Sequence, residues 1–385
     1  MLCLRRTYAK IYLDNLLFNA ENYKKLLPPT TELMCVVKAD AYGHGVKEIA
    51  AALQKRADVK WFAVSNIDEA RELRECGITG EILILGYTPP EEADSLIQND
   101  ILQACLNEEY ARELGSAATS GKVRVHIKLD TGMSRIGIDC SDIKNAADEA
   151  QRIYSADGIS VEGLFTHLCT ADSDDPDDIE FTHSQINKFN GVKNELISRG
   201  FDTGVCHFAN SAAGVYGYAE GSDLARLGII LYGLYPNHAL KVPMEMKPVL
   251  ELFSTVAEVK TVRSGASIGY GRTFTADRDI RVATITVGYA DGYPRLLSNR
   301  GEVLINGNRC PILGRVCMDQ IMADVSGVDV KPGDEVVLIG KSKDQQITSD
   351  DIADLCDTIG YEVTCDITKR VPKLFIENGE VTAVE

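Results

Sequence analysis

The sequence predicts an α/β protein: an N-terminal (β/α)8 barrel of the TIM type, followed by a mostly β C-terminal domain. Three observations predict this. Eight short apolar runs alternate with amphipathic stretches, the texture changes near residue 243, and 385 residues are more than one small domain needs. We place the barrel in residues 1–242 and the β domain in residues 243–385.

The barrel prediction depends on the apolar runs, most of which are followed by a helix-like stretch. Near-continuous apolar strands separated by helices indicate a parallel sheet that is buried on both faces. Eight such units in about 200 residues fit a closed barrel, although strand counting alone leaves a doubly wound open sheet as the alternative. The runs occupy residues 33–37, 61–64, 82–85, 101–104, 125–129, 161–165, 205–209 and 224–231.

The C-terminal part has a different texture. Runs such as LFSTVAEVKTV, IRVATITVGY and EVVLIG are rich in β-branched residues, and the turn signals SGAS, NGN and KPGD separate the runs of this region. Only SDDIADLCDTIG there has a helical pattern. In the barrel, the acidic run DSDDPDD (172–178) predicts the start of a helix, since carboxylates cap helix N-termini.

Composition excludes several classes of protein. Lys and Arg number 40 against 57 Asp and Glu, so the net charge of −17 argues against a nucleic-acid-binding surface. No segment is apolar for long enough to span a bilayer, and the N-terminus lacks the apolar core of a signal peptide. The 11 cysteines are scattered, without C-x-x-C or a metal-ligand cluster. We therefore expect a cytoplasmic protein with reduced thiols and no metal.

The stretch LMCVVKADAYGHG (33–45) ends a buried strand on Lys38. A lysine that merely terminates a strand at the surface is the ordinary interpretation. In a parallel barrel, however, the carboxyl ends of the strands form the mouth where catalytic residues lie. Partial desolvation there lowers the pKa of an amine and makes it a nucleophile that can form a Schiff base.

Other strand ends carry compatible groups. The loops after the last two barrel strands commonly bind phosphate through backbone N–H groups and a hydroxyl. Taken singly, a glycine at such a position could serve packing, a serine could cap a helix, and an arginine could simply be solvated. A lysine amine, a phosphate cradle, a flat histidine ring and an arginine together suggest pyridoxal phosphate. The residues are Asn210 and Ser211 after one strand, Arg226, Gly228 and Ile229 at the last, His167 after another, and Lys128, Asp130 and Arg135 at the fifth.

These motifs carry a family resemblance. The chain resembles the alanine racemases, fold-type III pyridoxal-phosphate enzymes, along essentially its full length. The family's fold is a barrel plus a β domain, and the first motif is the most specific. The motifs appear in the order VVKADAYGHG, KLDTGMSRIG, EGLFTHL, HFANSA, RLGIILYG, GYGRTF, GYADGYPR, CMDQ and GYEV.

The resemblance implies a role for each matching residue. Lys38 would hold the cofactor and act as the base on one face of the substrate, and Tyr270 would be the base on the other. Bases on opposite faces are what removal and return of an α-proton require. Lys128 matches a lysine that is carbamylated in some members. His167 would border the cofactor ring, and Arg226 would face the ring nitrogen. Arg135 and the Met318 backbone would hold the substrate carboxylate. The phosphate would be held by Tyr42, Ser211, Gly228, Ile229 and Tyr361, with Asn210 nearby.

The resemblance also implies a homodimer in which each active site is shared between two chains. There is one departure: Gly269 stands where a serine is common, and we expect little effect because the residue stays small. We expect alanine as the substrate, with D-alanine supplied to peptidoglycan. A serine or broad-specificity racemase is the alternative, against which the large ring of Tyr361 argues. A decarboxylase of the same fold type and a non-catalytic cofactor carrier are two further alternatives that agree less well with this sequence. Carriers of this kind lack the β domain, which in this chain supplies Tyr270.

Overall fold

The computed structural model describes residues 6–237 and 240–385, which divide into two compact units. The barrel unit consists of Leu17–Ala41 and Ile49–Met246. The β unit consists of the chain up to Leu16, Tyr42–Glu48 and Lys247–Glu385. In the described part of the chain, no helix combines the length and the apolar character that crossing a membrane requires.

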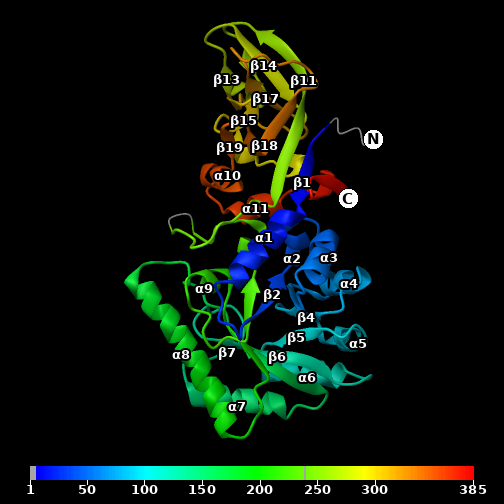
Figure 1. Cartoon of the computed structure of the whole chain (residues 1–385), viewed down its shortest axis with the longest axis vertical. Coiled ribbons are helices and arrows are strands. Elements are labelled where there is room, and N and C mark those ends of the chain that lie inside the picture. The colour runs from blue at the N-terminus through cyan, green and yellow to red at the C-terminus, as the bar shows by residue number, and fades with distance from the viewer. Residues whose placement is uncertain (1–5, 238–239) are drawn as a thin grey trace. The chain divides into compact units, whose positions relative to one another are not determined.

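The barrel unit contains the eight predicted strands, all parallel, with helices on the outside (Figure 1). The order is β10-β2-β3-β4-β5-β6-β8-β9, and a parallel bridge between Ala209 and Ala225 brings the chain after β9 back to β10. The predicted barrel is therefore confirmed, and the open sheet is excluded. The strands are β2 (Glu32–Val36), β3 (Trp61–Val64), β4 (Glu81–Ile84), β5 (Leu102–Cys105), β6 (Val123–Asp130), β8 (Ile159–Phe165), β9 (Val205–His207) and β10 (Leu224–Leu227), with the short β7 (Ile138–Asp139) beside β6.

Polar caps start the barrel helices where the strands end. The side chains of Asn66, Asn107 and Asp142 each accept a hydrogen bond from a backbone N–H of the first helical turn. Asp175 does the same within the acidic run, which confirms the predicted helix start there. The helices of the chain up to residue 215 are α1 (Leu13–Lys24), α2 (Lys38–Gly43), α3 (Val46–Arg56), α4 (Ile67–Glu75), α5 (Ala93–Gln98), α6 (Glu108–Ala117), α7 (Ile143–Tyr154), α8 (Pro176–Ser198) and α9 (Ser211–Val215).

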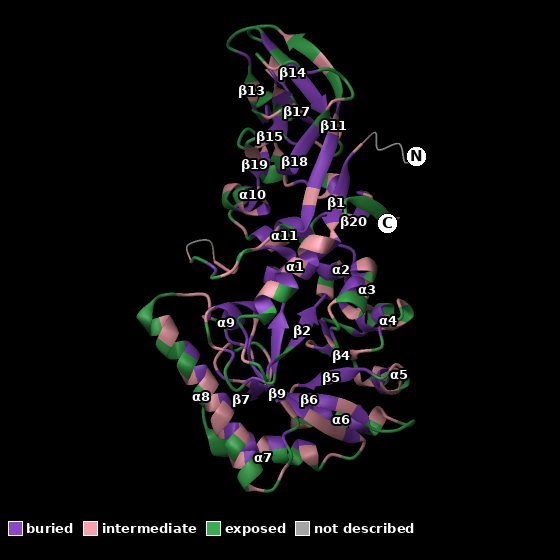
Figure 2. Cartoon of the chain, in the orientation of Figure 1, coloured by how far each residue is buried: buried purple, intermediate pink, exposed green. Residues whose placement is uncertain are grey.

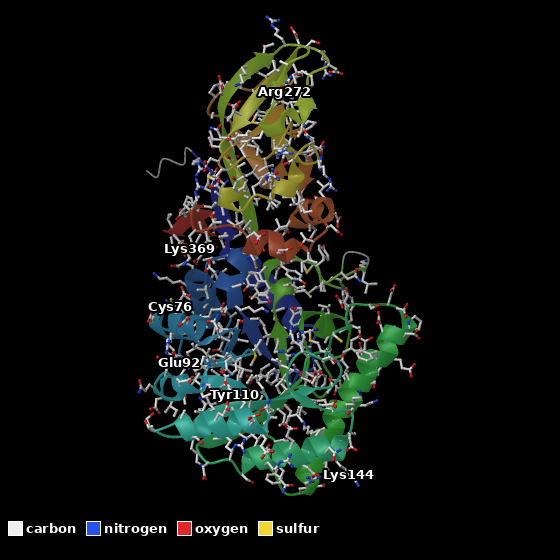
Figure 3. The ribbon with its side chains drawn as sticks, turned by 180° about the vertical axis from the view of Figure 1, so that it is seen from behind. Cys76, Glu92, Tyr110, Lys144, Arg272 and Lys369 are labelled. Carbon is white, nitrogen blue, oxygen red and sulfur yellow. The ribbon has the colours of Figure 1, made fainter. Side chains whose placement is uncertain are left out.

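The barrel strands are buried almost throughout, as the purple arrows of Figure 2 show. Side-chain hydrogen bonds join the outer helices to the loops. Tyr110 of α6, labelled in Figure 3, donates to the carbonyl of Thr88 at 2.7 Å, and the Thr88 hydroxyl donates to Gln103 of β5 at 2.6 Å. The polar side chains of Tyr110, Thr88 and Gln103 are thus paired inside the barrel unit, which holds the end of β5 in place.

The β unit is built on a ten-stranded sheet with the main order β16-β15-β18-β11-β1-β20-β21. The predicted helical stretch SDDIADLCDTIG (349–360) contains α10 (Ser349–Cys356), which ends at a left-handed Asp357, and a second short helix, α11 (Gly360–Cys365), was not predicted. The remaining strands are β1 (Tyr8–Tyr12), β11 (Leu250–Val262), β12 (Ser267–Ile268), β13 (Phe274–Thr275), β14 (Ile280–Ile285), β15 (Glu302–Ile305), β16 (Asn308–Pro311), β17 (Ile321–Asp324), β18 (Glu335–Ser342), β19 (Gln345–Ile347), β20 (Lys373–Glu377) and β21 (Glu380–Val384).

The first strand, β1, does not belong to the domain to which the sequence-based boundary at residue 242 assigns it. That boundary places residues 8–12 with the barrel, whereas β1 pairs with β11 antiparallel and with β20 parallel in the β unit. A five-residue strand carries no signal of its pairing partner, since both partners lie more than 200 residues away. The N-terminal strand is therefore part of the sheet that also carries the C-terminal strands.

Candidate active site

Five predicted site residues lie at the carboxyl ends of the barrel strands. Lys38 follows β2, Lys128 is the third residue from the end of β6, and Arg226 lies in β10. His167 follows β8, and Arg135 lies in the loop between β6 and β7. Burial and then the positive charges of all four basic residues hold the pKa of His167 well below its usual range. The barrel mouth thus brings four basic side chains around His167, although the chain as a whole carries a charge of −17.

The Arg226 side chain is buried without a carboxylate partner among the described residues. Its guanidinium donates to the carbonyls of Thr166 at 2.7 Å and Phe208 at 3.2 Å, at the ends of β8 and β9. It also donates to Nδ1 of His207 at 2.8 Å and to Nδ1 of His167 at 3.1 Å. Burial lowers the pKa of Arg226 to about 10, which leaves it protonated at neutral pH.

These bonds define the protonation of the neighbouring histidines. A guanidinium has donors only, so Nδ1 of His207 must accept and its proton must be on Nε2. That Nε2 lies 3.0 Å from Nδ1 of His126, which therefore accepts in turn. Burial is the main cause that keeps the pKa of His207 well below its usual range and lowers that of His126 to about 3. The three residues form a chain of directed bonds that ends at a buried Nε2 of His126 without a protein partner in the described part of the molecule.

Lys128 is also almost completely buried. Its amine donates to the carbonyl of Leu129 at 2.7 Å and lies 5.7 Å from the ring centre of Phe165. Burial lowers the pKa of Lys128 to about 8, with Arg226 and Arg135 adding to the decrease and Asp130 opposing it. Gly137 has a φ of +112°, and a Cβ there would lie 2.8 Å from Cγ of Lys128, so only glycine lets the loop pack this closely.

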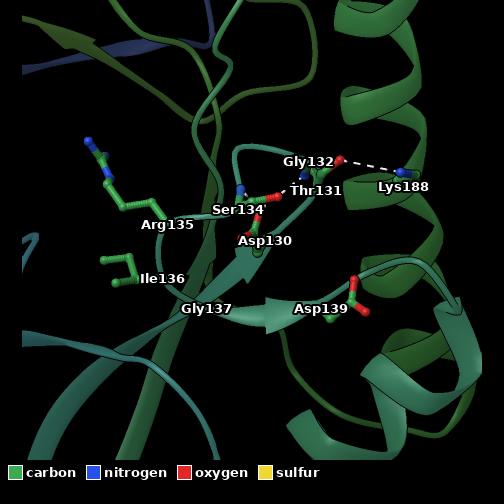
Figure 4. Close-up of a pocket in the computed structure, with 9 residues that line it drawn as sticks. All are labelled: Asp130, Thr131, Gly132, Ser134, Arg135, Ile136, Gly137, Asp139 and Lys188. Atoms are coloured by element: carbon green, nitrogen blue, oxygen red, sulfur yellow. Dashed lines mark hydrogen bonds between the residues drawn. The ribbon is translucent and has the colours of Figure 1, made fainter.

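The loop that carries Arg135 is folded around Asp130 (Figure 4). The Asp130 carboxylate accepts hydrogen bonds from the backbone N–H groups of Gly132 and Ser134, each at 3.0 Å. Lys188 of α8 donates to the carbonyl of Thr131 on the far side of the loop. The loop borders a hollow of about 430 Å³, and Figure 4 shows the Arg135 side chain pointing away from Lys188.

The two loops predicted to bind phosphate are joined to each other. The N–H of Gly228, after β10, donates to Oγ of Ser211, after β9, at 2.8 Å, and Ile229 begins the next turn. Asn210 is the N-cap of α9, where its side chain accepts from Ala213 N–H and donates to the carbonyl of Leu168. Ser211, Gly228 and Ile229 thus lie together. Both polar atoms of the Asn210 side chain are used, one in the helix cap and one in the bond to Leu168.

The residues after Lys38 form an unusual turn. Four consecutive non-glycine residues, from Ala39 to Tyr42, have φ between +51° and +55°, and Gly43 follows at +81°. This is a left-handed helical turn, which L-residues rarely adopt as a run. In the β unit, Gly43 packs so closely against the Thr364 carbonyl that a Cβ would lie 2.0 Å from it. Gly43, the first glycine of the DAYGHG motif, is therefore required because its backbone lies so close to that of Thr364.

Tyr42 and Tyr361, predicted on separate motifs, lie together in the β unit. Tyr42 ends the left-handed turn and is buried, and Tyr361 lies in α11. Their ring centres are 6.4 Å apart with an interplanar angle of 81°, an edge-to-face pair. This contact supports treating the two rings as one wall.

Tyr270 lies in the β unit on the turn η3 (Tyr270–Arg272) and is 72% exposed. It borders a hollow of about 660 Å³ that also includes Cys317, Met322 and Gly269. Arg272, labelled in Figure 3, anchors the turn by donating to Oγ of Ser267 at 2.8 Å. Gly269 has φ +71° and ψ −178°, a region open essentially to glycine alone, so this backbone favours the glycine that departs from the family pattern.

The loop of Met318 is held from two sides. The N–H of Ala290 donates to the Met318 carbonyl at 3.1 Å, within the GYADGYPR segment that also carries the half-exposed Tyr289. Buried Asp291 accepts a bidentate pair of bonds from Arg6 at 3.0 and 3.2 Å and lies 3.6 Å from Arg370. Arg370 in turn donates to Asp319, the residue after Met318, at 2.7 Å.

Sequence reasoning missed the residues that support the site from a distance. Arg6 and Asp291 are 285 positions apart, and no local pattern pairs them. His126 and His207 were also missed, although both lie in the predicted strands 125–129 and 205–209 as polar residues in apolar runs. A buried histidine in a barrel strand is the signal that could have found them.

The fold and the site define a class of protein: a parallel α/β barrel that carries a lysine and a buried, positively charged arginine at its mouth. Comparison with known proteins identifies the family. Residues 11–236 match the family profile of the alanine racemase N-terminal domain, and residues 249–375 match that of the C-terminal domain. The chain therefore belongs to the alanine racemase family.

Similar proteins agree over the full length. Alanine racemase 1 of Clostridium acetobutylicum is 40% identical over 99% of this chain and 98% of its own, and the alanine racemase of Clostridium novyi is 42% identical over 99% and 98%. Among solved structures, the alanine racemase of Clostridium difficile 630 has a TM-score of 0.93 at 38% identity, covering 100% of this chain and 99% of its own. A histidine racemase of Leuconostoc mesenteroides has a TM-score of 0.86 at 28% identity, covering 97% and 98%.

Our first prediction concerns Lys128. Carbon dioxide adds to a neutral amine and releases a proton, so carbamylation should increase as the pH rises through about 8, the pKa of this lysine. Arg135 and Arg226 supply the positive charge that a buried carbamate needs. With ¹³C-labelled bicarbonate, we expect a carbamate NMR signal that grows between about pH 7 and 9.

The matched control is Lys128→Arg, which keeps the charge and cannot form this adduct. The signal should be absent from that variant. A signal of unchanged intensity in Lys128→Arg, or no signal in the unaltered protein at pH 9, would contradict the assignment.

Proposed function

We propose that this racemase interconverts L-alanine and D-alanine, with pyridoxal phosphate held at the barrel mouth. The observation that carries the proposal is the set of four basic side chains around His167, in a chain with a net charge of −17. Such a site suits two anions, a phosphate and a substrate carboxylate. The names of the relatives, alanine racemases at about 40% identity over nearly the whole chain, support alanine as the substrate.

The residues present fit the cofactor. When bound, pyridoxal phosphate is linked to a lysine and withdraws electrons from Cα of the substrate. In our proposal, Lys38 provides the link, His167 borders the ring, and Arg226 meets the pyridine nitrogen. Arg226 keeps its proton because its pKa of about 10 is well above neutral pH, and its hydrogen-bond partners among the described residues are acceptors, so it can present a donor to that nitrogen. The phosphate would lie on Tyr42, Ser211, Gly228, Ile229 and Tyr361, near Asn210.

Two residues would move the proton. Lys38 Nζ takes or returns the α-proton on one face of the substrate, and Tyr270 Oη does so on the other. Arg135 and the backbone N–H of Met318 would bind the substrate carboxylate and orient Cα between the two bases. An arginine opposite the pyridine nitrogen leaves this nitrogen unprotonated, which weakens the electron withdrawal and limits side reactions.

The wall formed by Tyr42 and Tyr361 supports a small side chain on the substrate. The edge-to-face packing of these rings restricts movement of Tyr361. A methyl group would contact the ring, while a larger or hydroxylated side chain would need the ring to move. This argues for alanine over serine, which remains the alternative substrate together with a broader range of amino acids.

The assembly and setting are also part of the proposal. We propose a homodimer in which Tyr270 and Met318 of one chain complete the site of its partner. The 72% exposure of Tyr270 and the exposed side chain of Met318 support this, because both would otherwise face water. The ten described cysteines are free thiols, which supports a cytoplasmic location, where D-alanine would be supplied to peptidoglycan.

The function is tested by assaying racemisation of L-alanine and L-serine in parallel with pyridoxal phosphate added. We expect alanine to have a kcat/KM at least about tenfold higher, since one added group in a small pocket typically changes discrimination by 10–200-fold. Borohydride treatment should fix the cofactor's mass on Lys38, as peptide mass spectrometry would measure. Mass on another lysine, or serine turned over faster than alanine, would contradict the assignment.

The shared site is tested by combining two inactive chains. Lys38→Ala and Tyr270→Phe should each give a nearly inactive homodimer. In a heterodimer of the two, one site receives both lesions and the other receives neither, so activity should return to about half of the unaltered value. Co-expression with two different tags isolates this species.

Cofactor content provides the control for this experiment. The Tyr270→Phe homodimer should bind pyridoxal phosphate normally, because Tyr270 is not proposed to hold it. If each chain built its own site, both sites of the heterodimer would carry one lesion. A folded, cofactor-loaded heterodimer without activity would therefore refute the shared site.

A further inference from the structure

The Glu69 side chain joins the ends of two neighbouring barrel strands. One carboxylate oxygen accepts the N–H of Ala39 at 2.8 Å, and the other accepts the N–H of Ser65 at 2.7 Å. Ala39 is the residue directly after Lys38, and Ser65 is the residue directly after β3. All of these residues lie in the barrel unit. A single carboxylate thus fixes the backbone beside Lys38 relative to the next strand.

The position of Glu69 in its helix predicts a different partner. Glu69 is the third residue of α4, and the N-cap Asn66 accepts its N–H at 3.0 Å. In a capping box, a glutamate at this position bonds back to the N–H of the N-cap residue. Here its two oxygens are instead taken by Ser65, the residue before the cap, and by Ala39, which is 30 positions away.

The carboxylate also continues the strand ladder beyond its end. The N–H of Val37 donates to the carbonyl of Ala63 at 2.9 Å, the last regular bond between these two chain segments. The next N–H on the same side, that of Ala39, is taken by Glu69. The ladder is therefore extended by one bond, to the point where the chain turns away.

That point is where the strained backbone begins. Ala39 is the first of four consecutive non-glycine residues in the left-handed region. L-residues in this region place Cβ too close to the following carbonyl oxygen, so the turn needs contacts that hold it. The N–H of Ala41 bonds to the Val37 carbonyl at 3.0 Å inside the turn, whereas Glu69 ties the turn to the barrel. Glu69 thereby sets the position of the Ala39 backbone, next to Lys38, relative to the end of β3.

We propose that Glu69 is a positioning residue for Lys38: by holding the N–H groups of Ala39 and Ser65, it fixes the left-handed turn and thereby aims the Lys38 amine. This inference rests on the proposed role of Lys38 as the cofactor lysine. Glu69 itself touches neither substrate nor cofactor, and it acts only through the backbone of Ala39 and Ser65.

The test uses Glu69→Gln, with Asp68→Asn as the matched control. Glutamine keeps the size of the side chain, but an NH2 group with two donors replaces one of the two accepting oxygens, so the bond to either Ala39 or Ser65 is lost. Asp68 lies in the same helical turn, its side chain is 88% exposed, and its ion pair is with Arg71. Asp68→Asn therefore removes the same charge from the same helix end and leaves both hydrogen bonds of Glu69, to Ala39 and Ser65, intact.

The measurement is the rate at which apoprotein couples pyridoxal phosphate to Lys38, followed by borohydride quenching and peptide mass spectrometry. We expect Glu69→Gln to couple about tenfold more slowly than the unaltered protein, because a hydrogen bond to a charged acceptor is stronger than one to a neutral amide, and one of the two bonds is lost. Asp68→Asn should stay within about twofold, as expected for an exposed pair. Amide hydrogen exchange at Ala39 should accelerate in Glu69→Gln only.

The outcomes separate the two claims. If Glu69→Gln couples at the unaltered rate, or if Asp68→Asn is slowed equally, the positioning role is refuted while the role of Lys38 stands. If the unaltered protein places no cofactor on Lys38, the proposed function fails and the positioning role fails with it. Slow coupling in Glu69→Gln with a melting temperature within about 3 °C of the control supports positioning over general destabilisation.

Discussion

A buried arginine, with no carboxylate partner among residues 6–237 and 240–385, is the constraint on which the barrel mouth depends. A guanidinium taken out of water costs several kcal/mol unless its N–H groups find acceptors. The carbonyls at the ends of β8 and β9 and the Nδ1 atoms of two histidines supply those acceptors around Arg226. Each of these partners is neutral, so the positive charge is solvated but not cancelled. An uncancelled charge at a barrel mouth is what an anionic ligand needs.

The strand ends make this arrangement possible, and they also explain what the sequence could predict. All eight strands of the barrel were predicted from apolar runs, and Lys38, Lys128 and Arg226 were singled out because each lies near the carboxyl end of such a run. The rule that these ends meet at one mouth then predicts their proximity without any coordinates. The electrostatic coupling of Lys38, Lys128 and Arg226 with His167 agrees with that expectation.

The rest depends on contacts that local patterns do not encode. The left-handed turn after Lys38 consists of ordinary residues, Ala-Asp-Ala-Tyr, whose propensities give no sign of positive φ. Glu69 reads in the sequence as a helix-capping residue, and its bond to Ala39 follows from the packing of two strands. The same is true of β1, which joins the C-terminal sheet through pairings that residues 8–12 alone do not specify.

Neutral histidines in one tautomer should hold Arg226 as a charged donor. Nitrogen-15 NMR of histidine-labelled protein can measure this between about pH 6 and 8, where ordinary histidines titrate. We expect His167 and His207 to stay neutral over this range with the proton on Nε2, and we expect Arg226→Leu to change their Nδ1 shifts. An imidazolium signal for His207, or a proton on its Nδ1 in the unaltered protein, would rule out this arrangement.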